Sequence, residues 1–163
     1  MDELSAVETW AGALLGQLSP AGRRTVMRDV ARELRRSQQK RIAAQRNPDG
    51  SAYEPRKAKP TQKKAKGRDK RGRIRRTAMF MKLRTARLMK VDAEADGFAV
   101  GFAGRVGRIA RIHQGGERVP VTPGGPKYRY PARALLGFTD TDRAIILDWL
   151  TTTLRVGSAT RRG

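Results

Sequence analysis

His113 is the only histidine in the chain, so any imidazole chemistry depends on it. Its neighbours in sequence, Arg111, Ile112 and Gln114, supply neither a base nor a nucleophile. A catalytic triad assembled from distant segments is compatible with the sequence, because such partners meet only in the fold. A lone histidine on the apolar side of a helix is more often a hydrogen-bonded core or interface residue, and we favour that interpretation.

Three carboxylates, Asp92, Glu94 and Asp96, alternate along one predicted strand and would line one of its faces. A solvated edge face is the simpler interpretation, and a cation site is the alternative. The absence of Cys excludes a thiolate metal site, a cysteine nucleophile and disulfides. The sequence also lacks a P-loop and a GxGxxG motif. We therefore predict no enzymatic activity, no metal and no cofactor.

Positive charge is the strongest chemical signal in the sequence. The 163 residues include 36 Lys and Arg against 15 Asp and Glu, which gives a formal net charge of +21. Residues 56–90 hold sixteen of these bases and a single acid, whereas residues 1–22 hold three acids and no base. A dense basic segment attracts phosphate by counterion release. No aromatic residue lies between residues 54 and 79, so stacking on nucleobases is not expected there.

Three interpretations of this basic arm stay open. We favour docking on an acidic protein surface, such as the segment of a neighbouring subunit that contains Asp2, Glu3 and Glu8. Non-specific contact with nucleic acid and a purely solvated loop are the alternatives. The candidate anion-binding residues of the arm are Lys57, Lys59, Lys63, Lys64, Lys66, Arg68, Lys70, Arg71, Arg73, Arg75 and Arg76.

The N-terminal part of the chain predicts a helical hairpin. Apolar residues at helical spacing predict helices over residues 2–18 and 20–46, with Ser19 and Pro20 starting the second one. The inner face of the second helix should contain Val26, Met27, Val30, Leu34 and Ile42, and its basic outer face Arg23, Arg24, Arg28, Arg32, Arg35, Arg36, Lys40 and Arg41. Residues 1–50 thus form the hairpin, and residues 51–76, which lack periodicity, form a flexible basic arm.

Residues 77–156 predict an α+β core. Patterning indicates a short helix over residues 77–89, and then a hairpin that turns at Asp96-Gly97. A helix over residues 105–114 follows, and Gly115-Gly116 ends it. Its apolar side should contain Val106, Ile109, Ala110 and His113.

The end of the chain predicts a second, looser hairpin and a last helix. The hairpin turns around residues 123–126, and the helix begins at Thr139 with a capping box that Asp142 completes. The apolar face of this helix should contain Ile145, Ile146, Trp149, Leu150 and Leu154. Residues 157–163 predict a disordered tail. The predicted fold class is therefore α+β: an N-terminal helical hairpin, a small antiparallel sheet packed with helices, and a long basic arm.

Four stretches of the sequence occur together in a recognisable order. They are Ser37-Gln38-Gln39-x-Arg41-Ile42-x-x-Gln45 running into Pro48-Asp49-Gly50-x-x-Tyr53-x-Pro55-Arg56; Met79-Phe80-x-Lys82-Leu83; Ile109-Ala110-x-Ile112-His113-Gln114-Gly115; and Tyr130-Pro131-Ala132-Arg133-x-Leu135-Leu136-Gly137-Phe138-Thr139. Together they resemble the phage virion morphogenesis family, the tail-completion proteins of contractile-tailed bacteriophages. Ala134 departs from the pattern, because the family often has proline there. The glycine pair after Gln114 and the insert up to Pro126 are also individual to this chain.

The resemblance implies a structural role late in virion assembly, at the virion tail and neck, in a protein assembled in the host cytoplasm. It implies a homohexameric ring that caps the tail tube and enables head–tail joining. The implied partners are other copies of the chain, the tail tube, the head–tail connector and, as a further candidate, the sheath, with DNA in the channel as an additional contact. No membrane partner is expected.

The motif residues expected to shape the subunit interface are Gln38, Gln39, Arg41, Tyr53, Pro55, Arg56, His113, Gln114, Tyr130, Pro131 and Arg133. Each also has a simpler interpretation: the residues around Tyr53 pin the start of the arm, His113 and Gln114 cap a helix end, and Arg133 pairs with a carboxylate. A small basic protein that binds nucleic acid non-specifically is the alternative function, and an enzyme of unknown type ranks third.

Overall fold

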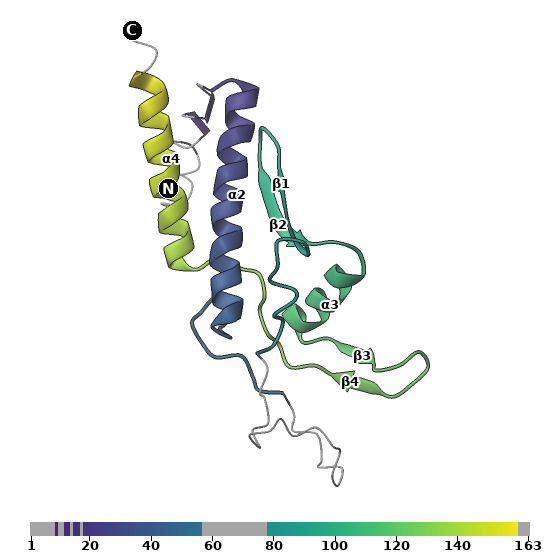
Figure 1. Ribbon diagram of the computed structural model, residues 1–163. Coiled ribbons are helices and arrows are strands. Elements are labelled where there is room, and N and C mark those ends of the chain that lie inside the picture. The colour runs from purple at the N-terminus through teal and green to yellow at the C-terminus, as the bar shows by residue number, and fades with distance from the viewer. Residues whose placement is uncertain (1–8, 10–11, 14, 17, 57–77, 160–163) are drawn as a thin grey trace, which may run out of the picture.

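The structure, a computed structural model, describes residues 9, 12–13, 15–16, 18–56 and 78–159, with side chains as far as residue 152. Its elements are the helices α2 (Pro20–Ala43), α3 (Gly104–Gly115) and α4 (Asp140–Ala159) and the strands β1 (Met89–Ala93), β2 (Phe98–Phe102), β3 (Arg118–Pro120) and β4 (Lys127–Arg129). Helix α2 forms the long axis, with α4 along one side and the β1–β2 hairpin along the other (Figure 1). The predicted α+β class is confirmed, and in the described part the strands form two separate antiparallel pairs.

The helical segments near the N-terminus agree with the sequence pattern as far as they are described. Five described residues of the first predicted helix are helical, namely Thr9, Gly12, Ala13, Leu15 and Gly16, whereas Leu18 lies in a bend. The rest of that helix lies outside the described residues, as do positions 57–77 of the basic segment and 160–163 of the tail. Helix α2 begins as predicted, because the Ser19 hydroxyl accepts a hydrogen bond from the Gly22 amide at 3.1 Å and Pro20 occupies the first helical position.

The inner face of α2 is the predicted one, with one exception on the outer face. Val26, Met27, Val30, Leu34 and Ile42 are all buried. Arg41 is buried as well, with an exposed fraction of 9%, so its placement on the solvated basic face was wrong. The physical reason is that the chain at residues 134–135 returns to the last turn of α2 and supplies carbonyl oxygens to this guanidinium.

The predicted helix over residues 77–89 is wrong. Residues 79–84 and 86–88 form turns, and Met89 begins strand β1. Phe80 adopts a left-handed backbone conformation with φ of 63°, which a right-handed helix does not accommodate. The Gln45 side chain also takes the amide and the carbonyl of Met79 as hydrogen-bond partners. Turns can therefore bury the same apolar residues that suggested helical periodicity.

Both predicted hairpins are present. Strand β1 pairs with β2 from Met89↔Phe102 to Ala93↔Phe98, and the turn that contains Gly97 is closed by a hydrogen bond from the Glu94 amide. Strand β3 pairs with β4 around the predicted second turn.

The three carboxylates near the first hairpin do not all belong to one strand, although all three line one open pocket at its turn. Asp92 lies in β1, whereas Glu94 and Asp96 follow the strand. Glu94 instead forms an ion pair with Arg24 at 3.3 Å.

The ends of α3 and α4 follow local sequence signals. Gly116, with φ of 64°, ends α3 in the left-handed conformation. At the start of α4 the Thr139 amide donates to Asp142 Oδ2 at 2.9 Å, and the Asp142 amide donates to Thr139 Oγ1 at 3.0 Å. This is the predicted capping box. The backbone of α4 continues to Ala159, three residues beyond the predicted end.

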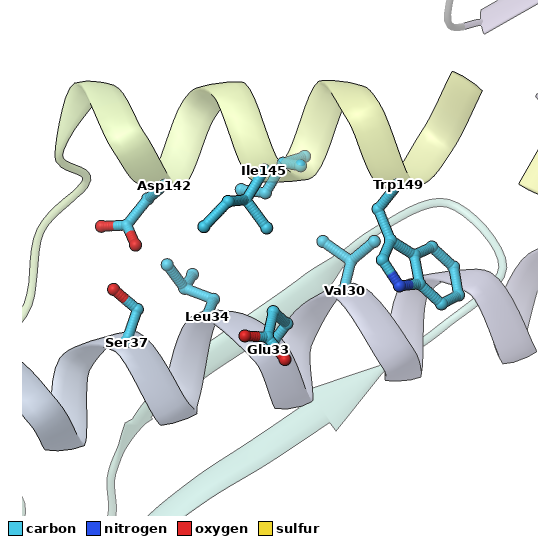
Figure 2. A pocket seen from close by; sticks show the side chains of 8 residues that line it. Val30, Glu33, Leu34, Ser37, Asp142, Ile145 and Trp149 are labelled. Atoms are coloured by element: carbon cyan, nitrogen blue, oxygen red, sulfur yellow. The ribbon is translucent and has the colours of Figure 1, made fainter. Parts of the chain in front are cut away.

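Two predicted apolar faces are only partly covered. On α3 Ala110 is buried, but Ile109 is 41% exposed. On α4 Ile145 is 38% exposed and lies at a shallow pocket between α2 and α4 (Figure 2). The Trp149 side chain closes one end of this pocket, and Ser37 and Asp142 lie at the other. The side chain of Leu154 lies outside the described part of the chain.

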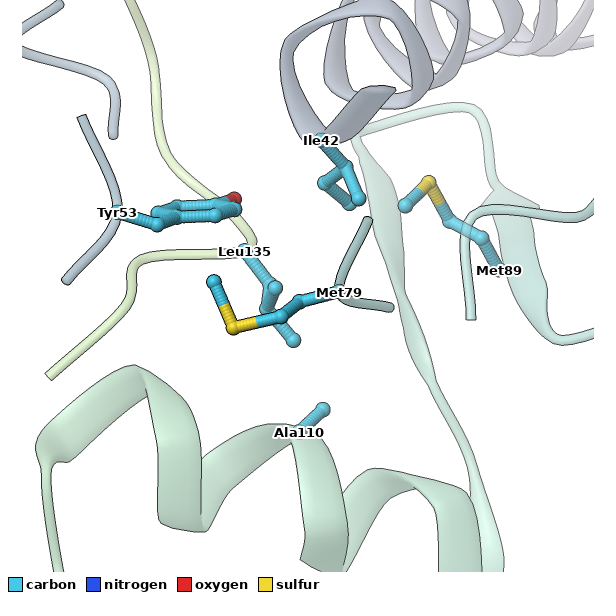
Figure 3. Packing of buried hydrophobic residues seen from close by; sticks show 6 residues of the cluster. All are labelled: Ile42, Tyr53, Met79, Met89, Ala110 and Leu135. Atoms are coloured by element: carbon cyan, nitrogen blue, oxygen red, sulfur yellow. The ribbon is translucent and has the colours of Figure 1, made fainter. Parts of the chain in front are cut away.

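The buried core gathers segments from most of the described chain. One cluster of it consists of Ile42, Tyr53, Met79, Met89, Ala110 and Leu135 (Figure 3). Residues 51–56, predicted as the beginning of the arm, belong to this folded part, because Tyr53 is 4% exposed and Ala52 forms a β-bridge with Arg46. Among the described residues, no helix has the length and apolarity needed to cross a membrane.

Candidate functional site, a polar network around residues 130–139

Residues 130–139 connect the second hairpin to α4 without regular secondary structure. Leu135 in this segment is nevertheless fully buried. Buried backbone amides and carbonyls need hydrogen-bond partners, and a strand or helix would normally supply them. Here side chains from three other parts of the chain do so, and most of them belong to the sequence motifs singled out above.

The first group comes from α2. Arg41 donates from Nη1 to the carbonyl of Ala134 at 2.9 Å and from Nη2 to that of Leu135 at 3.1 Å. Gln38 donates from Nε2 to the carbonyl of Gly137 at 2.6 Å, and its Oε1 accepts a bond from Arg41. Burial lowers the pKa of Arg41, and nearby Tyr53 partly offsets this effect. The last turns of α2 therefore hold the backbone of residues 134–137.

The second group is a single side chain at the end of α3. Gln114 accepts from the amides of Leu135 and Leu136 at 2.7 and 3.0 Å and donates to the carbonyl of Leu136 at 2.8 Å. The side-chain amide of Gln114 thus hydrogen-bonds the backbone of Leu135 and Leu136, as a neighbouring strand would do. The simpler interpretation of Gln114 as only a cap of α3 is wrong, because its bonds run to a segment 21–22 residues away.

The third group lies just after the turn that follows α2. Arg133 donates from Nε to the carbonyl of Glu54 at 2.7 Å and from Nη2 to that of Pro55 at 3.2 Å. The simpler interpretation, in which Arg133 pairs with a carboxylate, is wrong in that the described contacts include no such ion pair, although the nearby Glu54 charge partly offsets the burial that lowers the pKa of Arg133. Tyr53 donates from its hydroxyl to the carbonyl of Ala134 at 3.1 Å. Residues 53–55 and 133–134 are thus fixed to each other.

Sequence reasoning gave no site role to two residues that complete this network. Asn47 Oδ1 accepts from the Ala134 amide at 2.8 Å. Gln45 bonds both the amide and the carbonyl of Met79, at 2.7 and 2.9 Å. Gln45 lies in the first motif, four residues after Arg41, and this spacing is the sequence signal that could have identified it as a site residue.

His113 lies in a row of four edge-on aromatic contacts. The row runs Tyr53, Phe80, His113, Tyr130 and Tyr128, with ring centroids 5.9, 4.9, 5.2 and 4.9 Å apart. Burial lowers the pKa of His113, and the positive charges of Arg133 and Arg56 lower it further. His113 Nδ1 is buried without a hydrogen-bond partner among the described residues. The imidazole therefore packs as a neutral aromatic ring.

The side chains of the remaining motif residues make none of the described hydrogen bonds of the network. Pro55 and Arg56 are exposed, whereas Gln39, Tyr130 and Pro131 are half-buried. The basic-arm residues from Lys57 to Arg76 fall outside the described residues. Across the described part of the chain, no three carboxylate or histidine side chains are placed to hold a metal ion. What this arrangement does physically is to fix backbone segments relative to one another.

Comparison with known proteins gives a family and a relative. The model of the phage virion morphogenesis family matches residues 2–155. The chain is 39% identical over 147 residues to tail completion protein S of Escherichia phage P2, and the match covers 90% of this chain and 93% of the relative. No solved structure matches the chain significantly. The order of the four motifs, the match across nearly the whole sequence and the similarity to protein S agree, and the chain belongs to the phage virion morphogenesis family.

Proposed function

We propose that this chain is a structural protein that completes the phage tail, acting by binding and geometry without bond chemistry. Its family and its similarity to a tail completion protein support a role in tail assembly. The observation that carries the proposal is the polar network. Its motif side chains Gln38, Arg41 and Arg133 are buried and bonded to main-chain carbonyls, as expected of residues that shape a surface.

A homohexameric ring at the head–tail junction is the assembly we propose. Exposed apolar residues lie on the segment that the network fixes and on the helix that follows it: Phe138 is 49% exposed, Ile145 38% and Leu147 37%. Exposed large apolar side chains such as these are available for a protein contact. The proposed partners are neighbouring copies of the chain, the tail tube and the head–tail connector, with the sheath as a further candidate.

The motif residues then act on the interface in two ways. Those inside the network position residues 130–139 and the start of α4. Pro55 and Arg56 are exposed and are available for direct contact with a neighbour. The basic arm that follows them is proposed to bind an acidic surface of the next subunit.

Light scattering on nuclease-treated protein tests the assembly, alone and with isolated tail tubes, at low and high salt. We expect a particle of six times the 18.1 kDa subunit mass, either from the start or after tubes are added. An apolar interface should persist at high salt, since salt screens mainly exposed charges. A monomer in all four conditions would contradict the ring.

A pair of variants tests the surface. Phe138→Ser with Ile145→Ser should prevent particle formation and head–tail joining, because both changes remove exposed apolar area next to the network. Val121→Ser is the matched control. Val121 is 59% exposed, but it follows strand β3 in the loop of the β3–β4 hairpin. Equal joining by both variants would place the interface elsewhere.

A further inference from the structure

The β3–β4 hairpin carries its charges on one face. In Figure 1 the two strands run out past α3, and the loop that joins them lies at the far end. Arg118 is directly opposite Arg129, and Pro120 is opposite Lys127. Side chains alternate between the faces of a strand, so these two pairs share one face of the hairpin. Arg118, Lys127 and Arg129 are all exposed.

The charge on this face has no acidic counterpart among the described contacts. Residues 104–133 contain seven Lys and Arg and a single acid, Glu117. That acid forms an ion pair with Arg111 at 3.4 Å, and none of the described ion pairs involves the three bases on the hairpin. Like charges directly opposite each other destabilise a strand pair. A bound anion would relieve this repulsion.

We propose that the basic face of the β3–β4 hairpin binds the phosphate backbone of duplex DNA without regard to sequence. The major groove of DNA is about 12 Å wide and accepts a two-stranded ribbon. The planar guanidinium groups of Arg118 and Arg129 match phosphate oxygens bidentately, and Lys127 adds a point charge.

The chemistry of the hairpin favours DNA over an acidic protein. A protein interface is built around aromatic or large apolar anchors, and the one apolar residue on the basic face is Pro120. The apolar residues of the strands, Val119 and Tyr128, lie on the opposite face and are half-buried. The apolar side chain at the loop, Val121, is 59% exposed and lies outside the paired strands. The three bases lie outside residues 57–76 in the sequence, and the inference does not depend on the ring.

Fluorescence anisotropy with a short DNA duplex, measured over a range of salt concentrations, tests the proposal on the full chain. The logarithm of the binding constant falls with the logarithm of salt by about 0.9 per phosphate contact. Arg118→Gln with Lys127→Gln and Arg129→Gln should therefore reduce the slope by about 2.7. The basic arm contributes equally to every variant and cancels in the comparison.

A matched control removes the same charge elsewhere. Arg28→Gln with Lys40→Gln and Arg87→Gln neutralises three exposed bases outside the hairpin, and we expect its slope to stay near that of the parent. Arg118→Lys with Arg129→Lys keeps the charge, so it should keep the slope. Lys127→Gln alone should reduce the slope by about 0.9, which keeps the test decisive if the triple glutamine variant unfolds in circular dichroism.

Several results would overturn the proposal. An equal loss of slope in the hairpin and control variants would show only general attraction by net charge. Competition by polyglutamate as effective as that by DNA would indicate an acidic protein partner. Unchanged DNA binding with reduced solubility of the hairpin variant would mean that the bases merely protect the strand edges from aggregation. Light scattering of the same variants reports the ring independently.

Discussion

The Arg133 side chain donates a hydrogen bond to the main-chain carbonyl of Glu54 and not to the Glu54 carboxylate. The Arg133 Nε donates to the Glu54 carbonyl oxygen at 2.7 Å, and the Glu54 side chain is exposed. The same guanidinium also reaches the Pro55 carbonyl. The hydrogen bonds that position residues 54–55 therefore come from Arg133 to the main chain, and the Glu54 carboxylate acts on the guanidinium only through its charge.

Arg133→Ala should therefore destabilise the fold, whereas Glu54→Gln should not. The alanine variant leaves two carbonyls without a donor, and we expect a loss of about 2 kcal/mol in the free energy of unfolding. Glu54→Gln should change it by less than about 0.5 kcal/mol. Urea denaturation followed by circular dichroism measures both. Comparable losses in the two variants would mean that the carboxylate is the real partner.

Arg41→Ala should be among the most destabilising single changes in α2. It removes donors to the carbonyls of Ala134 and Leu135 and leaves Gln38 without one partner. Buried groups left without partners cost about 1 to 3 kcal/mol, so we expect a loss of about 3 kcal/mol in urea denaturation.

The control for Arg41 is another arginine of the same helix. Arg36 pairs with Glu33 at 3.0 Å on the exposed side of α2. Exposed pairs of this kind contribute little, and Arg36→Ala should cost less than about 0.5 kcal/mol. If both alanine variants lost the same stability, the network would not support the last turns of α2.

The sequence predicts the parts of this fold that depend on neighbouring residues. Ser19 begins α2, Gly116 ends α3, and Thr139 with Asp142 begins α4, because each signal acts within one helical turn. Asp96-Gly97 marks its hairpin for the same reason. Local hydrogen bonding and backbone preference are enough to specify these ends.

The sequence does not predict features that depend on distant segments. Arg41 repeats the spacing of the exposed arginines of α2, and its burial follows from carbonyls 93 and 94 residues further along the chain. Phe80 has the apolar spacing of a helix, yet the contacts of Gln45 with Met79 hold turns there. The order of the motifs identifies these residues. It does not predict that side chains such as Gln38 and Arg41 point into the fold rather than toward a partner.

His113 should titrate below its ordinary pKa of 6.5, because burial and two nearby arginines disfavour the imidazolium. The unfolded chain then takes up a proton at a higher pH than the folded chain does. Folding stability therefore falls as the pH drops through 6.5 toward the lower folded pKa. We expect lower stability at about pH 5.5 than at about pH 7.5, in urea denaturation.

His113→Phe is the control for this pH dependence. It keeps an aromatic ring between Phe80 and Tyr130 but removes the titrating group, so the difference between the two pH values should shrink. The single imidazole also gives one unambiguous set of ring signals in NMR. A midpoint at or above 6.5 in that titration would contradict the packing of a neutral ring.

Gly137 should not tolerate a side chain, although it lies outside any helix or strand. Its φ of 152° is rare for other residues, and an added Cβ would lie 2.7 Å from Pro48 Cγ. The carbonyl of Gly137 also accepts the Gln38 side chain, so a shift of this residue would disturb the network. We expect Gly137→Ala to lower the free energy of unfolding by more than about 1 kcal/mol.

Gly115→Ala is the matched substitution, at the end of α3. Its added Cβ would meet Glu117 Cγ at an ordinary 3.7 Å, and alanine is the better helix former by about 1 kcal/mol. It should leave stability unchanged or raise it. Opposite signs for the two variants in the same urea experiment would tie the loss to the close approach of Gly137 and Pro48. A neutral Gly137→Ala would instead show that residues 134–137 shift freely, and the polar network would then not be what orients the start of α4.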